Sequence, residues 1–437
     1  MNDSLLALSV IIGCFSLVLF RIPLAVALLL SGFAGMVCLT SWTAAITQLN
    51  IVVWEAAANP LFITIPMFIW MGQLASVSGA MQDIYRCSEL WLRRSPFGLA
   101  YTALFTSAGF GVLSGSSVAS VAGVAPIAMP AMQKSGYPTR LASGVVASSG
   151  VLSILIPPSI PLVIVGLWTE TSIGDLFVAV IVPGLILLAL YMLTIAVFFR
   201  ESGKALMENR NAYEGVSPED YSLRERLKAL MVVVPFFSVA AFVLVLIYGG
   251  ICSPIEAASI GALAVLCFGG VSKRLSMASV VLSLRRSGYI SISLIFLLLG
   301  GMMFARFIAQ SGMVEDILSW FEIAKYSPAT IFLLIVLMYL LLGALIDSIS
   351  MVMVSLPITY PLVLSLGYDP VWFGVFVVMM VELSLMTPPI GINVLTLKQT
   401  IPELSLKDIY LGCIPFLLVS LLLVCLLIVY PQMTALL

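Results

Sequence analysis

Long apolar blocks make up most of this chain, and short polar or proline-containing stretches interrupt them. A helix needs about 20 predominantly apolar residues to cross the roughly 30 Å hydrocarbon core of a bilayer. The blocks are long enough for this, and they predict about ten membrane-crossing helices. We expect these spans near residues 4–20, 23–41, 51–78, 141–168, 175–199, 229–249, 255–271, 287–310, 370–397 and 409–430.

Two further apolar stretches, 98–134 and 329–366, differ from the others. Each contains a central cluster of Gly, Ser or Asp that is followed by two prolines. A single uninterrupted helix is not favoured by such a sequence, because proline removes a backbone hydrogen bond and glycine is a poor helix former. We therefore predict that each stretch is a helical hairpin that enters and leaves the membrane on the same side.

Composition supports a membrane protein. Hydrophobic residues are 61% of the chain, charged residues are 9%, and the mean hydropathy is +1.16. A soluble domain could not cover that much apolar surface. The first apolar run has no basic region before it and no small-residue cleavage site after it, so we expect the first helix to be retained rather than removed as a secretory signal.

The two halves of the chain are related by an internal repeat. Five prolines of the first half return in the second half at a constant displacement of 231 residues. At an average proline usage of about 5%, chance predicts fewer than one such match. Gly-Tyr at 136–137 and 367–368 keeps the same displacement, as do two pairs of serines. The proline pairs are Pro23 with Pro254, Pro126 with Pro357, Pro130 with Pro361, Pro157 with Pro388, and Pro158 with Pro389.

The basic residues indicate how the repeats are oriented. If the N-terminus lies outside and each hairpin turns back, 18 of the 20 Lys and Arg residues fall on the cytoplasmic side, the exceptions being Arg306 and Lys325. The connection at 80–96 is basic while its repeat mate at 314–327 is nearly free of basic residues, and the reverse holds for 42–54 and 271–287. Corresponding loops therefore face opposite sides, which predicts an inverted repeat with both termini periplasmic.

These observations predict an all-α polytopic membrane protein that contains an inverted repeat, two re-entrant helical hairpins and two broken transmembrane helices. The first repeat is 1–199, the second is 229–437, and 200–228 is a solvated cytoplasmic linker with six basic and six acidic residues. We expect scaffold helices over 4–78 and 229–310, hairpins over 98–134 and 329–366, broken helices over 141–168 and 370–397, and final helices over 175–199 and 409–430.

Candidate chemistry lies at two pairs of helix interruptions. They are 111–120 and 155–159 in the first half, and 343–350 and 386–393 in the second. Backbone groups freed at such breaks must be buried in protein or line a watery cavity. Exposed carbonyl and hydroxyl oxygens suit a small cation such as Na⁺, while free N–H groups at half-helix N-termini suit a carboxylate. Close helix packing is the competing explanation for each small residue taken singly.

Charged residues within apolar sequence are further candidates. A carboxylate near the bilayer centre costs at least about 2.5 kcal/mol on insertion scales, so Asp347 is a candidate Na⁺ ligand. Arg306 is a candidate partner for a substrate carboxylate, and snorkelling to the outer interface is its alternative. Glu382 and Glu256 are weaker candidates, for which the alternative is contact with a polar crevice.

Several classes of function are disfavoured. The chain has no histidine, which excludes a zinc HExxH site and a Ser/His dyad, and Asp347 has no second intramembrane aspartate with which to form a catalytic pair. We therefore do not expect an enzyme. An inverted repeat does not suggest the pore of a symmetric channel, and a scaffold protein would not need paired helix breaks. Secondary transport is favoured, because such transporters bind substrates at discontinuous helices of repeated units.

The motifs at these breaks resemble those of one family over essentially the whole chain. The family is the large membrane subunit, M or DctM-like, of tripartite ATP-independent periplasmic (TRAP) transporters. Many of its members have glycine where this chain has Ser153 and Ser384, and some have an acidic residue where it has Ser120. The segments that carry the resemblance are Leu113–Ala119, Ile127–Ala131 with Lys134–Tyr137, Leu155–Ile160, Gly343–Ser348, Gly367–Gly374 and Thr387–Asn393.

The resemblance implies an elevator-type transporter of the bacterial inner membrane that uses a Na⁺ gradient to import organic anions, C4-dicarboxylates among them. It also implies two partners besides the lipid bilayer: a small four-helix membrane subunit (Q) and a periplasmic substrate-binding protein (P). No cofactor other than the coupling ion and no nucleic acid is expected. The Na⁺ sites carried over from the family are Ser114, Gly115, Ser116, Ser117, Pro157, Pro158, Asp347, Ser348, Thr387, Pro388 and Gly391.

Polar side chains beside the same breaks are the candidate substrate ligands. They are Ser120, Ser159, Ser350 and Asn393, together with Arg306. The alternative function is a stand-alone Na⁺/carboxylate symporter or exchanger with a related two-hairpin architecture, which would need no periplasmic protein.

Overall fold

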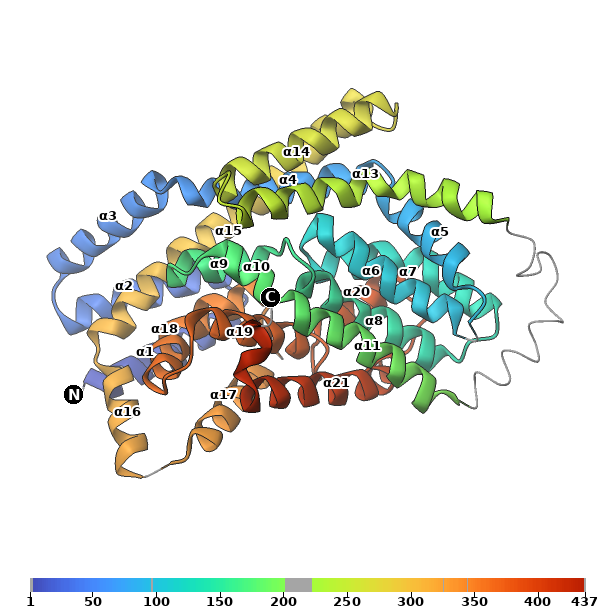
Figure 1. The fold of residues 1–437 in the computed structure, drawn as a ribbon. Coiled ribbons are helices and arrows are strands. Elements are labelled where there is room, and N and C mark those ends of the chain that lie inside the picture. Colours follow the sequence, from blue (N-terminus) through green and yellow to red (C-terminus); the bar gives the residue numbers. More distant parts are fainter. Residues whose placement is uncertain (1–2, 96, 201–221, 325, 344, 436–437) are drawn as a thin grey trace.

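The computed structural model describes residues 3–95, 97–200, 222–324, 326–343 and 345–435, and every regular element within them is a helix (Figure 1). Lys325 and most of the predicted linker therefore lie outside the described residues. The first-half helices are α1 (Asp3–Leu19), α2 (Leu24–Leu39), α3 (Trp42–Ala58), the 3₁₀ turn η1 (Pro60–Ile63), α4 (Thr64–Val77), α5 (Ala80–Leu92), α6 (Gly98–Ser114), α7 (Ser117–Lys134), α8 (Thr139–Leu155), α9 (Ile160–Thr169), α10 (Ile173–Ala179) and α11 (Ile181–Phe198). The second half has α13 (Leu223–Tyr248), α14 (Pro254–Val271), α15 (Met277–Gln310), α16 (Met313–Ile323), α17 (Pro328–Gly343), α18 (Ser348–Ser365), α19 (Pro370–Ser384), α20 (Ile392–Thr400), α21 (Leu406–Val429) and the 3₁₀ turn η2 (Pro431–Ala435).

The all-helical, multi-pass prediction is confirmed. Among the described residues, seven helices are long and apolar enough to cross a membrane, and an eighth span results if α8 and α9 count as one bent crossing. Five more apolar helices are shorter, including α1 and α2, which have 17 and 16 residues. The expected count of about ten crossings is therefore not reached by helix length alone.

Helix starts preserve the repeat. α7 and α18 begin at Ser117 and Ser348, and α8 and α19 begin at Thr139 and Pro370, each pair 231 residues apart. The second-half scaffold helices α13 and α14 begin with complete capping boxes. In α14 the Ser253 hydroxyl accepts from Glu256 N while the Glu256 carboxylate accepts from Ser253 N, so Glu256 caps an exposed helix end.

One predicted span is divided in the structure. The expected helix over 51–78 is split, because α3 ends at Ala58 and α4 begins at Thr64. The Asn59 side chain accepts from Leu61 N (2.9 Å) and Pro60 cannot continue the α-helical hydrogen bonding, so a short 3₁₀ turn forms. The second half has Ile290 and Ser291 at the corresponding positions, and α15 runs through them unbroken.

Several predicted connections are also helical. α3 covers the stretch 42–54, and the first turns of α15 lie within its mate, 271–287. α5 and α16 occupy most of the connections at 80–96 and 314–327, and both are amphipathic. Charged residues had suggested loops there, but charges on one side of a helix are compatible with apolar packing of the other side.

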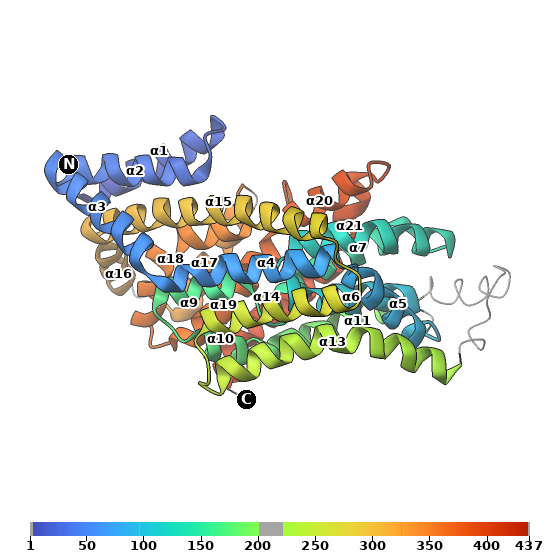
Figure 2. The ribbon, with the colours of Figure 1, turned by 90° about the horizontal axis from the view of Figure 1, so that it is seen from above.

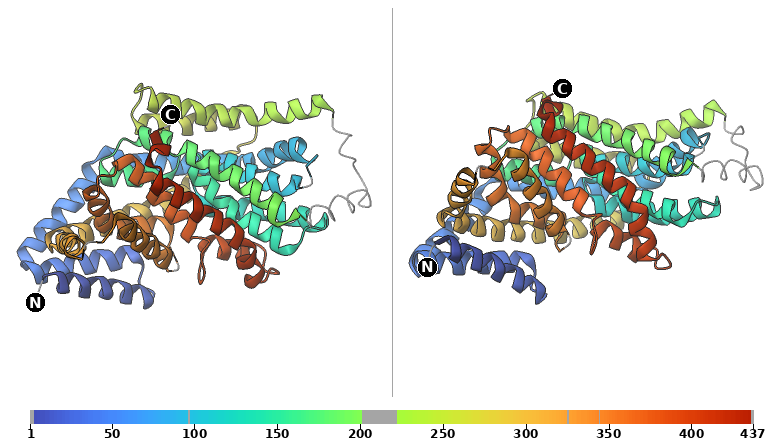
Figure 3. Two further views of the ribbon diagram at one scale, coloured as in Figure 1. Left: turned by 60° about the horizontal axis from the view of Figure 1, so that its bottom comes forward. Right: turned by 90° about the horizontal axis from the view of Figure 1, so that it is seen from below.

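Four scaffold helices pack in pairs that cross between the repeats. α2 of the first half lies against α15 of the second, and α14 of the second half lies against α4 of the first. A β-carbon at Gly32 of α2 would lie 2.7 Å from the backbone of Phe304, and one at Gly261 of α14 would lie 2.8 Å from Met71. Glycine thus permits the close approach of these helices. Figures 2 and 3 show α1 and α2 at one edge of the molecule and α13 at the opposite edge.

The hairpins and broken helices form a second packed group. α8 contacts both helices of the first hairpin, α6 and α7, and α19 contacts both helices of the second, α17 and α18. After the breaks the contacts cross over, because α9 lies against α18 and α20 lies against α7. Each half-helix therefore packs against the hairpin of the opposite repeat, which brings all four interruptions into one group.

Candidate functional site

The first hairpin turns within two residues. α6 ends at Ser114, Gly115 has φ +56° in the left-handed region, and the Ser116 side chain caps α7 by accepting from Ala119 N (3.3 Å). A β-carbon on Gly115 would lie 3.1 Å from both Pro158 O and Ile160 N. Glycine is favoured here by its conformation and by space. The tip of the first hairpin thus lies directly against the first helix break.

The second hairpin presents a carboxylate at its tip. Asp347 caps α18, accepting from the backbone N–H of Ser350 (3.4 Å) and from the Ser350 hydroxyl. The Asp347 side chain is exposed, whereas Ser350 is buried. Sequence analysis had placed this carboxylate near the bilayer centre, and the structure instead shows it accessible at a helix N-terminus, where a negative charge is stabilised.

Both broken helices interrupt at the predicted Pro-Pro sequences. α8 and α9 are bent by 43° across residues 156–159, and α19 and α20 are separated by residues 385–391, with Gly391 at φ +53°. The Thr387 hydroxyl donates to Leu383 O (3.2 Å). From α21, the Tyr410 hydroxyl lies 2.6 Å from Pro389 O and 2.8 Å from Ile390 O, so two carbonyls of this break have a side-chain partner.

One acidic residue joins the two hairpins. Glu382 of α19 is completely buried, and its Oε1 accepts from the Ser348 hydroxyl at 3.4 Å. The Ser117 side chain also hydrogen-bonds the same carboxyl group, while Oε2 has no hydrogen-bond partner. Sequence analysis ranked Glu382 below Asp347. The available signal was a lone acid in an otherwise apolar helix that leads into a Pro-Pro break.

Further buried polar atoms near the interruptions also have no partner. A β-carbon on Gly150 of α8 would lie 3.0 Å from Asn393 Nδ2 and 3.1 Å from Ser117 O, so the Asn393 side chain reaches the first hairpin. Buried polar groups are rarely left unpaired in proteins, so such atoms indicate a place where an ion, a substrate or water binds. The unpaired side-chain atoms at the predicted site positions are the hydroxyls of Ser114, Ser120 and Ser159 and both amide atoms of Asn393.

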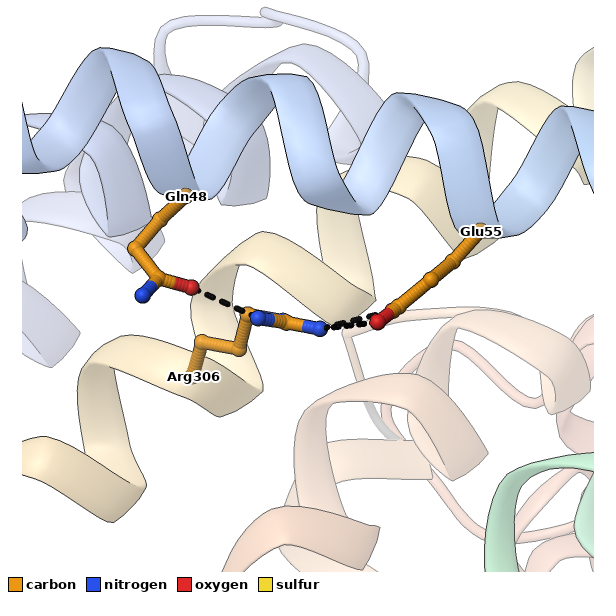
Figure 4. A network of polar contacts seen from close by, with 3 residues as sticks. All are labelled: Gln48, Glu55 and Arg306. Carbon is orange, nitrogen blue, oxygen red and sulfur yellow. Dashed lines mark hydrogen bonds and ion pairs between the residues drawn. The ribbon is translucent and has the colours of Figure 1, made fainter.

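Arg306 lies in a different environment. Its guanidinium donates to Gln48 Oε1 (2.6 Å) and forms an ion pair with Glu55 (2.6 Å), and both partners are on α3 (Figure 4). The structure thus pairs Arg306 with a scaffold helix and does not bring it to a hairpin tip. Gln48 and Glu55 were not candidates in the sequence, because their contact with α15 is non-local.

The site is rich in oxygen donors and poor in transition-metal ligands. Within the described part of the chain, no group of three or more His, Cys, Asp or Glu residues could hold a metal ion. Hydroxyls, carbonyls and isolated carboxylates are the ligands preferred by hard cations. The arrangement therefore suits an alkali cation and a small anion better than a transition metal.

Fold and site together define a class. Two helical hairpins, two broken helices and an internal repeat form the architecture in which secondary transporters bind their substrates. Over residues 11–433 the chain matches the family described as tripartite ATP-independent periplasmic transporter, DctM component. The chain belongs to this family and is a large permease subunit of a TRAP transporter, a multi-pass membrane protein and not an enzyme.

Characterised relatives extend over most of the chain. The C4-dicarboxylate TRAP transporter large permease protein DctM of Pseudomonas aeruginosa is 31% identical over 379 residues, which is 86% of each chain. The 2,3-diketo-L-gulonate TRAP transporter large permease protein YiaN of Escherichia coli is 29% identical and covers 95% of each chain. Among solved structures, the Alcanivorax borkumensis YdaH transporter has a similar fold, with a TM-score of 0.61, 15% identity and 90% coverage of each chain.

Proposed function

We propose that this subunit imports a carboxylate-bearing organic anion into bacteria by Na⁺ symport. In this proposal a periplasmic substrate-binding protein delivers the anion, and a small four-helix membrane subunit assembles with the chain in the inner membrane. Membership of a tripartite transporter family supports the need for further components.

The observation that carries this function is the gathering of unpaired buried oxygens and amides beside the helix interruptions. Ser114 and Ser159 belong to the first hairpin and its adjoining break, while Asn393 follows the second break. A protein that left these groups without ligands would lose stability, because each buried polar atom without a partner costs about 1–3 kcal/mol. An ion and an anion that bind there would recover that cost.

Na⁺ ligands in this proposal come from both hairpin tips and from the breaks that they face. Na⁺ would neutralise Asp347 and the nearby carbonyl dipoles, order the tips and so create a pocket that accepts an anion. The candidate ion ligands remain Ser114, Gly115, Ser116, Ser117, Pro157, Pro158, Asp347, Ser348, Thr387, Pro388 and Gly391. The candidate substrate ligands remain Ser120, Ser159, Ser350, Asn393 and, if its pair with Glu55 opens, Arg306.

Transport would follow an elevator mechanism. The hairpins and broken helices pack as one group, and α2, α4, α14 and α15 pack as another, which supports movement of the first group against the second. A group loaded with Na⁺ and anion has its charges compensated and would cross readily, while the half-loaded group would not. That difference in free energy between loaded states constitutes the coupling.

The substrate is proposed only as a chemical class. The two relatives described above are named for different compounds, a C4-dicarboxylate and 2,3-diketo-L-gulonate. Small and hydroxyl-bearing residues line the breaks here, and many carboxylates could satisfy them. The distribution of 18 of 20 basic residues supports an orientation with both termini in the periplasm.

Uptake into proteoliposomes tests the proposal. Vesicles would hold this chain and its small partner, and a panel of radiolabelled organic acids would be offered with and without an inward Na⁺ gradient and the periplasmic protein. Accumulation that requires both is the expected result and identifies the substrate. Accumulation without the periplasmic protein would instead establish a stand-alone Na⁺/carboxylate symporter.

A further inference from the structure

Glu382 is the one charged side chain among the buried residues of the described chain, and it has no basic partner there. Its 0% exposure removes it from water and from lipid headgroups alike. A carboxylate in such a position is costly unless a cation or a proton neutralises it. Its surroundings therefore require a positive charge that the described side chains do not supply.

The position of this carboxyl group is set by both hairpins. Ser117 is the first residue of α7 and Ser348 is the first residue of α18, and both hydroxyls hydrogen-bond Glu382. Helix N-termini carry a partial positive charge, which favours the ionised carboxylate when the hairpins are docked. Oε2 has no partner and remains available to a ligand.

The repeat shows that the fold itself does not need an acid here. The position 231 residues earlier is Val151 of α8, which is also buried, at 1% exposure. A broken helix can thus pack in the same architecture with an apolar residue at this point. The acid in only one repeat is therefore better explained by binding than by packing.

We propose that Glu382 is a cation site between the two hairpins, and that Na⁺ and a proton compete for its carboxyl group. This inference rests on the proposed function, because it assigns a ligand and a pH dependence to the coupling ion. With either cation bound the carboxyl is neutral and links α7 to α18. With neither bound, the unpaired charge favours separation of the hairpin tips or entry of water.

Other titratable groups on the packed elements have partners or lie at the surface. The hydroxyl of Tyr339 on α17 is 2.8 Å from Ser355 Oγ, and that of Tyr191 on α11 is 2.8 Å from Ser420 Oγ. Cys413 of α21 is buried. The remaining charged groups on elements around α19 are exposed near helix ends: Asp347, Glu170, Asp175 and Arg140, with Arg140 paired to Asp408.

Equilibrium binding of ²²Na⁺ to the purified full chain in lipid nanodiscs, at pH 6 to 9 and without any organic anion, tests the inference. We expect the apparent Kd for Na⁺ to fall by up to about tenfold per pH unit while the proton is being displaced. Glu382→Gln should lose one bound Na⁺ per chain and the pH dependence. Glu403→Gln removes the same carboxylate from an exposed loop and should change neither quantity.

Two results would overturn the inference. The first is a Kd of the unaltered chain that does not change with pH, which needs no variant and so remains decisive even if Glu382→Gln does not fold. The second is a folded Glu382→Gln that binds as many Na⁺ ions as the unaltered chain. Complete absence of Na⁺ binding by the unaltered chain would contradict the proposed function as well, so the two failures are distinguishable.

Discussion

Gly111 of the first hairpin lies directly against the backbone of Ser153 in the first broken helix, with no space for a β-carbon. The second repeat contains the same relationship, because Gly343 lies against the β-carbon of Ser384 with equally little space. Each hairpin is thus docked on its broken helix through a glycine and a serine that are related by the repeat. Close approach at these two points positions both hairpin tips beside the Pro-Pro breaks.

Alanine at either glycine should force the hairpin away from its broken helix. We expect Gly111→Ala and Gly343→Ala each to lower the free energy of unfolding by about 1–3 kcal/mol, the usual cost of overpacking, and to reduce Na⁺-driven uptake. Thermal unfolding in detergent and proteoliposome uptake would measure both effects. Gly288→Ala is the matched control, because no atom lies within 4 Å of a β-carbon there. Equal behaviour of all three variants would contradict the docking role.

Asp347→Asn should abolish Na⁺-driven uptake and leave membrane assembly intact. Asparagine can still cap α18, so the variant removes the charge and preserves the helix start. Asp369 caps α19 by accepting from Val371 N (2.8 Å) and Trp372 N (3.2 Å), so Asp369→Asn makes the same change at an exposed cap outside the hairpins. Uptake should persist in that control. Normal Na⁺ dependence of Asp347→Asn would exclude Asp347 from the ion site.

Two buried serines should respond differently to alanine. The hydroxyl of Ser159 has no partner, while that of Ser420 lies 2.8 Å from the Tyr191 hydroxyl. Ser159→Ala should leave stability unchanged or slightly raised and weaken substrate or Na⁺ binding. Ser420→Ala should cost about 1–3 kcal/mol, because it leaves a buried hydroxyl unpaired, without a change in affinity. Unfolding midpoints and the KM for uptake would be compared, and the opposite pattern would exclude Ser159 from the binding site.

The Arg306–Glu55 pair should act as one unit. Both side chains are partly exposed, at 30% and 46%, so a coupling of at most about 1 kcal/mol is expected in a double-mutant cycle of Arg306→Gln and Glu55→Gln. The readout is thermal unfolding. If Arg306→Gln raised the KM for the anion and Glu55→Gln did not, Arg306 would bind substrate in spite of its pairing in this structure.

Local signals in the sequence were sufficient for part of the site. The turn at Gly115 and the caps at Ser116 and Asp347 follow from residue types that favour those conformations, and both Pro-Pro sequences interrupt helices as expected. The break at Asn59–Pro60 has an equally local cause, but the apolar block around it favoured a single span. Hydropathy averages over such a break and therefore did not reveal it.

The sequence by itself determined the class of protein, the repeat and the positions of the interruptions, because apolar length, proline and glycine act through the local backbone and the bilayer. The tertiary structure decided which interruptions meet and which charges are paired. Glu382 contacts residues from two hairpins, and Arg306 pairs with a helix about 250 residues earlier in the chain. Such contacts depend on how the helices pack, and the packing of α19 between two hairpins is not encoded in the periodicity of any one segment.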